Sequence, residues 1–342
     1  MPLSKIKTNS VADEVFESGS NIITNGAMRI AQRGASTTGL QNSGGVFTID
    51  RFSHRRGGTW SNAQFKHEQV DATVTGEPSL DKALKVTCTT AEGSVPASGE
   101  AVAIGTYLEK GDTHRLGVGT SAALKSTFSF YARASIATTY GVEVMAYQHS
   151  TEQAIRIPFT ISSANTWERI SVSIPADTAA LDSDADNTQG WSFHVVLDGV
   201  ASSDTASAWA NLASSGVSLP NGVSTTTFSN TLNATFEITG VQLEAGEVAT
   251  PFQHEDYSTT LNKCKRYFQV VEPNSIYSSY GATYNYVHWT FSPEMRANPT
   301  LAGTMGGTVD GVNTRFAQRY SAGSNYAYFK GSSTRVTADA EL

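Results

Sequence analysis

Hydrophobic and polar residues alternate over short stretches through most of the chain. The clearest run has Ile155, Ile157, Phe159 and Ile161 at every second position, with Pro158 inside it. Because successive side chains of a strand point to opposite faces, this period predicts a strand with one buried face. Proline cannot donate to a strand ladder, so Pro158 predicts an edge strand or a bulge. The same alternation predicts further strands at residues 84–88, 128–132, 142–146, 170–174 and 191–197.

A strand that changes phase is predicted at residues 236–243. Phe236 and Ile238 lie two apart, as one buried face requires. Gly240 interrupts the alternation, and Val241 with Leu243 resumes it in the opposite phase, which is the pattern of a β-bulge or bend. Strands this short, separated by Gly-, Asn- and Ser-rich turns, are typical of a β sandwich or jelly roll. No repeat of fixed length is present, which argues against a β-helix.

One segment, residues 254–269, has a helical period. Asp256 is placed to cap the first turn through its carboxylate. About three turns would then follow, with one apolar face made of Tyr257, Leu261, Cys264 and Phe268. The segment is interpreted as a helix that links two domains.

These patterns predict an all-β protein in four parts. Residues 1–20 are polar and are interpreted either as a disordered start or as an N-terminal attachment arm that orders against a partner, and 21–253 form a jelly-roll-like β sandwich. The short helix over 254–269 leads into a small C-terminal β domain over 270–342. So short a β domain can build only a modest core, so we expect trimerisation to supply further burial.

Composition restricts the partners. The charged fraction of 16% lies well below the roughly 25% of ordinary soluble domains, and Gly, Ser, Thr and Asn fill the difference. A net charge of −7 argues against a nucleic-acid partner. The opening residues contain no apolar signal region, and no apolar run is long enough to insert in a membrane.

Two cysteines, Cys88 and Cys264, cannot form a disulfide framework or a cysteine zinc site. Both are therefore expected to be buried thiols, with a bridge between them as the alternative.

The best candidates for ligand binding are aromatic residues in the C-terminal domain. If Val287, Trp289 and Phe291 point inward, Tyr284, Tyr286 and His288 share the outer face, with Tyr280 just before them. Such rings can stack on sugars. The alternative is that they pack between the subunits of a trimer.

Two tryptophans in loops are weaker candidates for the same chemistry. Trp60 lies in a glycine-flanked loop, and Trp209 lies in a Ser- and Ala-rich one. The alternative interpretation is that each ring covers the end of the core. The basic stretch 51–56 is interpreted as a solvated or subunit-pairing surface.

The acidic loop with Asp182, Asp184 and Asp186 is the candidate metal site. An EF-hand loop requires Gly at its sixth position and Glu at its twelfth, where this chain has Asn187 and Phe193. We therefore expect a solvated acidic turn and no cofactor, with a looser calcium site as the alternative.

No arrangement typical of an enzyme is evident. The histidines form no H-x-x-x-H pair, and there is no G-x-S-x-G elbow. Carboxylates such as Glu100, Glu109 and Asp112 would form a glycosidase pair only at a suitable separation in space, which the sequence does not contain. We expect no catalytic residues and no enzymatic activity.

Several motifs resemble those of a known class of proteins. GVQLEAG (240–246), ATPFQHEDY (249–257) and LNKCKRYFQ (261–269) resemble the junction between a carbohydrate-binding-module-like jelly roll and a C-terminal β domain in tail-fibre and related virion surface proteins of tailed bacteriophages. NIITNGAMRIAQRG (21–34) with DRF (50–52), NTWERISVSIPAD (165–177) and ADAEL (338–342) resemble the opening, middle and end of such proteins.

The resemblance implies a homotrimeric tail fibre or receptor-binding protein on the outer surface of a virion, more on the tail than on the head. Such a protein is made in the cytoplasm of the host bacterium. It would attach to other virion proteins through residues 1–20 and adhere to host surface glycans without catalysis. The alternatives are a capsid decoration protein or head fibre that uses the same module structurally and, less favoured, a virion-borne glycan hydrolase.

Overall fold

The structure, a computed structural model, describes residues 21–94, 96, 99–182, 188–202, 208–212, 217–223, 227–271, 275–278, 284–303, 308–322 and 336–342. At positions 271, 275–278, 284–287, 310 and 319–322 it describes the backbone alone. The expected attachment arm, residues 1–20, lies outside the described residues.

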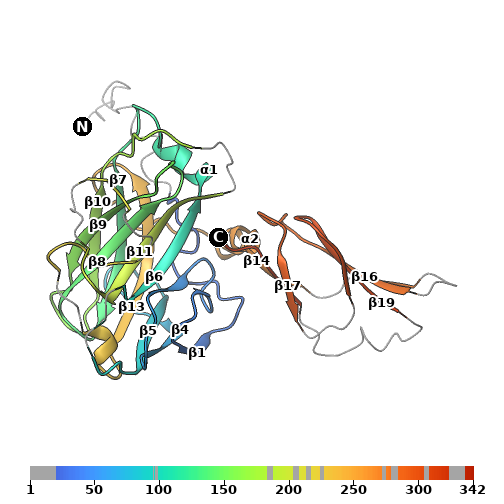
Figure 1. Cartoon of the computed structure of the whole chain (residues 1–342), viewed down its shortest axis with the longest axis horizontal. Coiled ribbons are helices and arrows are strands. Elements are labelled where there is room, and N and C mark those ends of the chain that lie inside the picture. The colour runs from blue at the N-terminus through green and yellow to red at the C-terminus, as the bar shows by residue number, and fades with distance from the viewer. Residues whose placement is uncertain are drawn as a thin grey trace, which may run out of the picture.

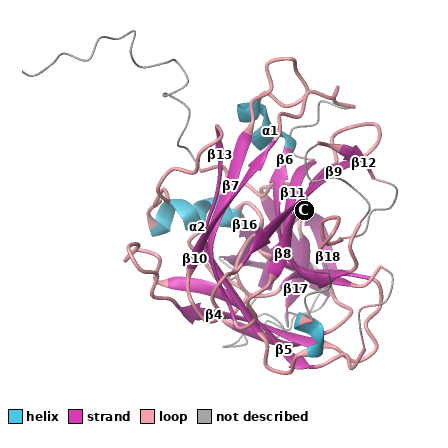
Figure 2. Cartoon of the chain, turned by 90° about the vertical axis from the view of Figure 1, so that its left-hand side faces the viewer, coloured by secondary structure: helices cyan, strands magenta, loops and turns pink. Residues whose placement is uncertain are grey.

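Two antiparallel sheets pack face to face as a sandwich (Figure 1 and Figure 2). One has six strands in the order β1 (Ser36–Leu40), β4 (Gln64–Asp71), β5 (Lys82–Thr90), β13 (Thr235–Ala245), β7 (Ser126–Ala134) and β10 (Glu168–Ile174). The other has seven, in the order β12 (Ala210–Asn211), β9 (Gln153–Thr160), β8 (Thr139–Ala146), β11 (Gln189–Gly199), β6 (Ala101–Glu109), β3 (Ser53–Gly57) and β2 (Gly45–Val46). The prediction of an all-β, jelly-roll-like sandwich is confirmed.

The core lies between the two sheets and is rich in aromatic rings. Phe128 of β7 stacks on Phe193 of β11 across the sandwich, with ring centroids 4.7 Å apart. Both are at most 1% exposed, and alternate residues of the neighbouring strands surround them. Fully burying a phenylalanine side chain contributes about 1.5–3 kcal/mol, so rows of such residues along both sheets hold the layers together.

The two irregularities expected in the strands are present. β9 pairs with β8 along its whole length, but β12 pairs only with Gln153 and Ala154. Among the described residues, no strand pairs with the other side of β9 at Pro158. In β13 the register with β7 shifts between Thr239 and Gln242. Gly240 lies at this bulge with φ +61°, and a Cβ there would come within 2.8 Å of Leu80 Cδ1.

The linking helix α2 is shorter than expected and spans Tyr257–Lys265. Its predicted cap is confirmed, since the Asp256 side chain accepts a hydrogen bond from Thr259 N at 2.9 Å. The prediction of an apolar helix face from Tyr257 to Phe268 is wrong at both ends. Tyr257 is 55% exposed, and Phe268 already belongs to the next strand. The helix ends before Phe268 because the residues from Phe268 onward form a strand that pairs with residues 336–339.

The remaining helical turns are short. Within the described ranges they are α1 (Lys110–Thr113), η3 (His114–Leu116) and η4 (Phe228–Asn230), and none of them was predicted. Among the described residues no helix is long and apolar enough to cross a membrane.

The C-terminal domain is built from two smaller sheets (Figure 1). A three-stranded sheet has the order β14 (Phe268–Val271), β20 (Val336–Asp339) and β17 (Thr300–Gly303), and it lies beside α2. A four-stranded sheet has the order β15 (Ser275–Ser278), β16 (Tyr284–Thr290), β19 (Phe316–Ala322) and β18 (Thr308–Val312), and it lies at the end of the molecule far from the sandwich. Their shared core contains Trp289, Phe291, Met295, Ala317, Val336 and Ala338.

Both cysteines are free and buried, Cys88 in β5 and Cys264 in α2, as predicted. Burial raises the pKa of the Cys88 thiol to about 11 and that of Cys264 further. Both thiols therefore stay protonated and unreactive at neutral pH.

Candidate functional site

The outer face of the four-stranded sheet is the candidate site expected from the sequence. Trp289 of β16 is 1% exposed and packs with Ala317 of β19 in the domain core. Because side chains alternate along a strand, Tyr284, Tyr286 and His288 belong to the opposite face of β16. Tyr280 lies outside the described residues.

The strand register aligns Tyr277, from the same aromatic-rich stretch, with Tyr286 and adds Tyr320, which the sequence did not bring together with them. Tyr277 of β15 lies directly opposite Tyr286 of β16, and Tyr286 lies directly opposite Tyr320 of β19. Directly opposite residues share one face of a sheet, so three tyrosines form a row across three strands. The next two rows pair His288 with Gln318 and Thr290 with Phe316.

The side chains described on this face include one accessible aromatic ring and the polar groups of His288 and Gln318. Phe316 is 39% exposed on β19, and His288 is partly buried. Tyrosine joins a large apolar ring to a hydroxyl that both donates and accepts hydrogen bonds, and such residues are enriched where proteins contact partners. Tyr320 was missed because it is 34 positions beyond Tyr286 and only the register aligns them.

Neither loop tryptophan is an exposed ring of the kind that stacks on sugars. Trp60 is 1% exposed, packs edge-to-face on Phe65, and donates its indole N–H to Ala101 O at 3.3 Å. A ring this buried presents no face to a ligand, so the core-covering interpretation holds for Trp60. Trp209 is partly buried, lies 5.2 Å from the Trp191 ring and donates to Pro175 O at 3.1 Å.

The candidate metal loop is only partly described. The Asp182 carboxylate accepts a hydrogen bond from Lys110 Nζ at 3.0 Å, which gives it a protein cation as partner. Asp184 and Asp186 lie outside the described residues. Within the described part of the chain, no group of three or more metal-ligating side chains is present, and the calcium site stays a prediction.

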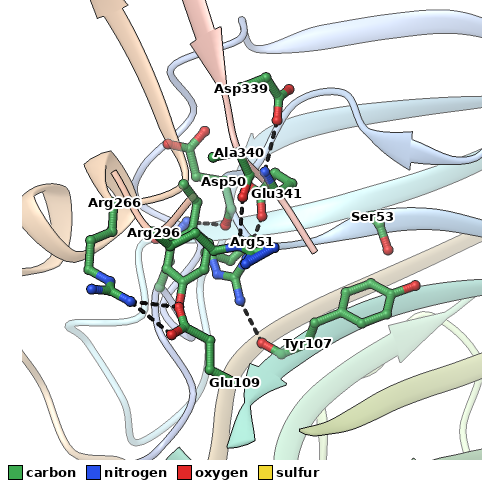
Figure 3. A network of polar contacts seen from close by, with 12 residues as sticks. Asp50, Arg51, Ser53, Tyr107, Glu109, Arg266, Arg296, Asp339, Ala340 and Glu341 are labelled. Carbon is green, nitrogen blue, oxygen red and sulfur yellow. Dashed lines mark hydrogen bonds and ion pairs between the residues drawn. The ribbon is translucent and has the colours of Figure 1, made fainter. Parts of the chain in front are cut away.

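A second site that the sequence did not predict joins the sandwich to the C-terminal domain (Figure 3). Arg266, directly after α2, donates from Nη2 to both carboxylate oxygens of Glu109 on β6, at 2.9 and 2.8 Å. The Tyr267 hydroxyl donates to the same carboxylate at 2.6 Å. Glu109 is therefore held by three hydrogen bonds, and Asp112 is occupied as well, since it accepts from Glu109 N at 3.1 Å. Both carboxylates thus take part in the hydrogen bonding of the junction.

Arg51 lies at the centre of this junction. It is 3% exposed, donates to Tyr107 O at 2.6 Å, pairs with the Glu341 carboxylate, and stacks 3.4 Å from the Tyr267 ring centroid. Burial lowers the pKa of Arg51, but the Glu341 carboxylate and the Tyr267 hydroxyl outweigh it, so the guanidinium stays charged. The interpretation of residues 51–56 as a solvated or subunit-pairing surface is wrong for Arg51, which pairs within its own chain.

Further contacts fix the last strand against the sandwich. Arg33 binds Asp339 at 3.0 Å and stacks 3.7 Å from the Phe268 ring centroid. Arg296 donates to Ala340 O at 2.7 Å. Beneath them Asp50 is fully buried, and this burial raises its pKa to about 6 despite hydrogen bonds from Gln32 and the nearby Arg33.

The sequence contained a signal for this junction. The motifs that carry the family resemblance contribute one or two of its residues each: Arg33, then Asp50 with Arg51, then Arg266 with Tyr267, then Asp339 with Glu341. Motifs separated by more than 200 positions meet in one network. Glu109 lies in none of these motifs.

The outward face of the seven-stranded sheet is a further polar region, but it is covered. Glu143 accepts from Arg156 Nε at 2.6 Å and contacts His194 Nδ1 at 3.0 Å, and all three side chains are at most 3% exposed. Residues 217–223 pack over the neighbouring apolar positions of β6 and β11. This network stabilises the sheet from outside and, among the described residues, has no exposed aromatic platform.

Comparisons with known proteins give distant matches only. No protein-family model matches the chain, and no curated protein matches it in sequence. The tandem carbohydrate-binding modules CBM22-1 and CBM22-2 of Xyn10C from Paenibacillus barcinonensis are 7% identical, with a TM-score of 0.34 over 95% of this chain and 91% of that one.

Two other solved structures are similar to the chain at the same level. The enzymatically active domain of tailspike protein 4 from bacteriophage CBA120 is 10% identical, with a TM-score of 0.32 over 66% of this chain and 21% of that one. The family 11 carbohydrate-binding module of Lic26A-Cel5E from Clostridium thermocellum is 11% identical, with a TM-score of 0.29 over 64% of this chain and 100% of that one. At these scores the likeness is distant.

Proposed function

We propose that the protein is a non-enzymatic adhesin of a bacteriophage virion, a tail fibre or receptor-binding protein that contacts host surface glycans with the outer face of its four-stranded sheet. The observation that carries this proposal is the row of Tyr277, Tyr286 and Tyr320 across three neighbouring strands. The virion context comes from the sequence motifs that meet at the junction.

The chemistry of the face fits a sugar. A pyranose ring presents C–H groups on its face and hydroxyls around its edge, so it packs on an aromatic ring while its hydroxyls find donors and acceptors. The tyrosine row supplies rings and hydroxyls, and the adjacent His288 and Gln318 add an imidazole and an amide. A face of this kind binds by many weak contacts and performs no bond cleavage.

The position of the face fits adhesion. The four-stranded sheet lies at the far end of the molecule from the sandwich (Figure 1). The junction around Arg51 and Glu109 fixes the domain that carries this sheet against the sandwich. In this proposal residues 1–20 attach the chain to other virion proteins, a homotrimer multiplies the weak contacts, and the protein is made in the cytoplasm of the host bacterium.

One observation favours a second function. Phe316, on the same face, exposes an apolar ring that suits packing against another protein chain. In that case the tyrosine row is a subunit interface, and the protein is a capsid decoration protein or a head fibre.

Localisation on intact particles distinguishes these functions. An antibody against the purified protein, gold-labelled and viewed by electron microscopy, is expected to mark the tail. Label distributed over the head would contradict the adhesin and support the decoration protein. Particles of a phage that lacks the gene provide the control for non-specific label.

A further inference from the structure

A cavity lies between the sandwich and the start of α2, and its lining is separate from the tyrosine face. One wall is formed by the turns after Asn21, as far as Arg29, and the other by the arm from Phe252 to Asp256 with the first turns of α2. Its volume of about 370 Å³ falls within the roughly 300–1,000 Å³ of small-molecule sites.

The walls of this cavity are held in place by hydrogen bonds across more than 200 positions of sequence. Asn21 donates from its amide side chain to Val241 O at 3.0 Å and accepts from Leu243 N at 3.1 Å. Gln253 accepts from Asn21 N at 2.9 Å and donates its own backbone N–H to Gln242 Oε1 at 2.9 Å. The cavity is therefore preformed, and a ligand loses little affinity to ordering of the walls.

A close backbone contact keeps the first wall near the sandwich. A Cβ at Gly26 would lie 2.0 Å from Val241 O, and Val241 N donates to Gly26 O at 2.9 Å. Only glycine permits this approach. Phe252, 8% exposed, supplies an apolar part of the lining.

The rim combines an exposed ring with hydrogen-bonding groups of both kinds. Tyr257 is 55% exposed at the start of α2 and lines the cavity. His254 contacts Ser79 Oγ through Nε2 at 2.6 Å, and Lys263 pairs with Glu255. An exposed tyrosine beside a polar cavity is an arrangement in which a ring can stack on a ligand.

The charges select the class of ligand. The charged side chains in the lining are two cations, Arg29 and Lys263, and two carboxylates, Glu255 and Asp256, so they sum to zero with His254 neutral. A phosphate, sulfate or sugar acid requires an excess of cations. A neutral sugar, which donates and accepts at every hydroxyl, matches a lining with equal numbers of both signs.

We propose that this cavity is a subsite for one neutral sugar unit, which stacks on Tyr257 and hydrogen-bonds to the polar lining. The proposal rests on the proposed function in taking a glycan as the ligand class, but its residues are separate from the tyrosine face. Contacts at two sites on each chain would let a branched or long glycan bind with higher avidity than either site gives alone.

The test is ligand-observed NMR on the full-length protein with glucose, galactose, mannose and N-acetylglucosamine as neutral probes and N-acetylneuraminic acid as the anionic probe. At least one neutral sugar is expected to bind. Tyr257→Ala, which removes the ring, is expected to weaken that binding roughly threefold to tenfold. Ala27→Phe, which adds a large side chain at the cavity wall, is expected to abolish the binding that remains when Tyr286 and Tyr320 are alanine.

Asn262→Ala is the matched control, because Asn262 is exposed on the same helix and does not line the cavity. Binding of the anionic sugar alone, or of none of the probes, would overturn the proposal. So would neutral-sugar binding that both cavity variants leave unchanged. The same titration with Phe316→Ala and the Tyr286→Ala, Tyr320→Ala pair reports separately on the outer face, so failure of one site is distinguishable from failure of the other.

Discussion

Arg266 binds both carboxylate oxygens of Glu109 across the boundary between the linking helix and the sandwich, at 2.9 and 2.8 Å. The pair joins residues 157 positions apart, and the Glu109 side chain is only 9% exposed. One guanidinium nitrogen, Nη2, donates to both oxygens, and the Tyr267 hydroxyl adds a third hydrogen bond to the same carboxylate. The C-terminal domain is thus held at a defined angle to the sandwich.

Glu109→Ala is expected to loosen this junction. The substitution leaves Arg266 and Tyr267 without their shared acceptor, which costs about 1–3 kcal/mol of unfolding free energy. Urea unfolding followed by tryptophan fluorescence measures the change, and limited proteolysis near α2 reports opening of the junction. Lys263→Ala, which breaks an exposed pair on the same helix, is the control and is expected to change stability by less than about 0.5 kcal/mol. Equal stability of the Glu109→Ala variant and the parent would contradict the role of the junction.

The buried histidine pair predicts loss of stability in acid. His54 Nδ1 lies 3.1 Å from His67 Nε2 inside the sandwich, and burial lowers the pKa of His54 to about 4 and that of His67 well below 6.5. Their stabilising contribution is complete well above pH 6.5, where both imidazoles are neutral in the folded and in the unfolded state. It is lost as the pH falls from 6.5 towards 4, because the unfolded state binds protons that the folded state excludes.

Melting temperatures between pH 8 and pH 4.5 measure this dependence. His67→Phe is expected to flatten the decline, since one titrating group is removed. His114→Asn, at an exposed position in η3, is the control and is expected to keep the slope of the parent. A decline that is as steep in His67→Phe as in the parent would rule out the pair as its cause.

Asp50 predicts the opposite dependence at the junction. Burial raises its pKa from 3.8 to about 6, so its stabilising contribution is present below pH 3.8 and is lost as the pH rises through 6. The difference between the two pKa values corresponds to about 3 kcal/mol of unfolding free energy. Asp50→Asn is expected to gain stability relative to the parent as the pH rises from 4 to 7, measured by urea unfolding at each pH. The exposed substitution Asp81→Asn serves as control, and a difference that does not vary with pH would refute the prediction.

The tyrosine row is expected to bind the host without supporting the fold. Changing Tyr286 and Tyr320 together to alanine is expected to lower binding to host cells at least tenfold with little change in melting temperature. Binding of the fluorescently labelled protein to cells provides the measurement, and Leu232→Ala, an exposed change on the sandwich, is the control. A large fall in melting temperature would instead identify the tyrosines as part of a subunit interface.

The assembled protein is expected to be a trimer. Sedimentation equilibrium is expected to give three times the chain mass of 36.4 kDa. Deletion of the chain from Lys263 onward is expected to lower stability, because it removes the C-terminal domain and with it the partners of Glu109 and Arg51. A stable full-length monomer would contradict the trimer.

Much of the fold was predictable from local patterns. Period-two alternation located β9 and β11, and the phase change at Gly240 located the bulge in β13. The carboxylate of Asp256 marked the start of α2. Each of these signals lies within a few residues of the feature it predicts, because turns, caps and faces depend on local geometry.

The sites depended on contacts that no local pattern contains. Trp60 and Tyr257 are both aromatic residues in polar surroundings, yet one is 1% exposed and the other 55%. Tertiary packing alone determines which of the two rings is buried. In the same way, the end of α2 is set by pairing of Phe268 with Asp339, and the row from Tyr286 to Tyr320 is set by strand register.

The order of strands in the C-terminal domain separates the residues that hold the domain to the sandwich from those that face outward. The three-stranded sheet that touches the sandwich takes its strands from residues 268–271, 300–303 and 336–339, and the strands of the outer sheet are the excursions between them. Trp289 and Ala317 tie these excursions to the shared core. The outward-facing residues of both excursions can therefore be replaced together, by evolution or by design. The three-stranded sheet and its ion pairs to the sandwich would stay unchanged.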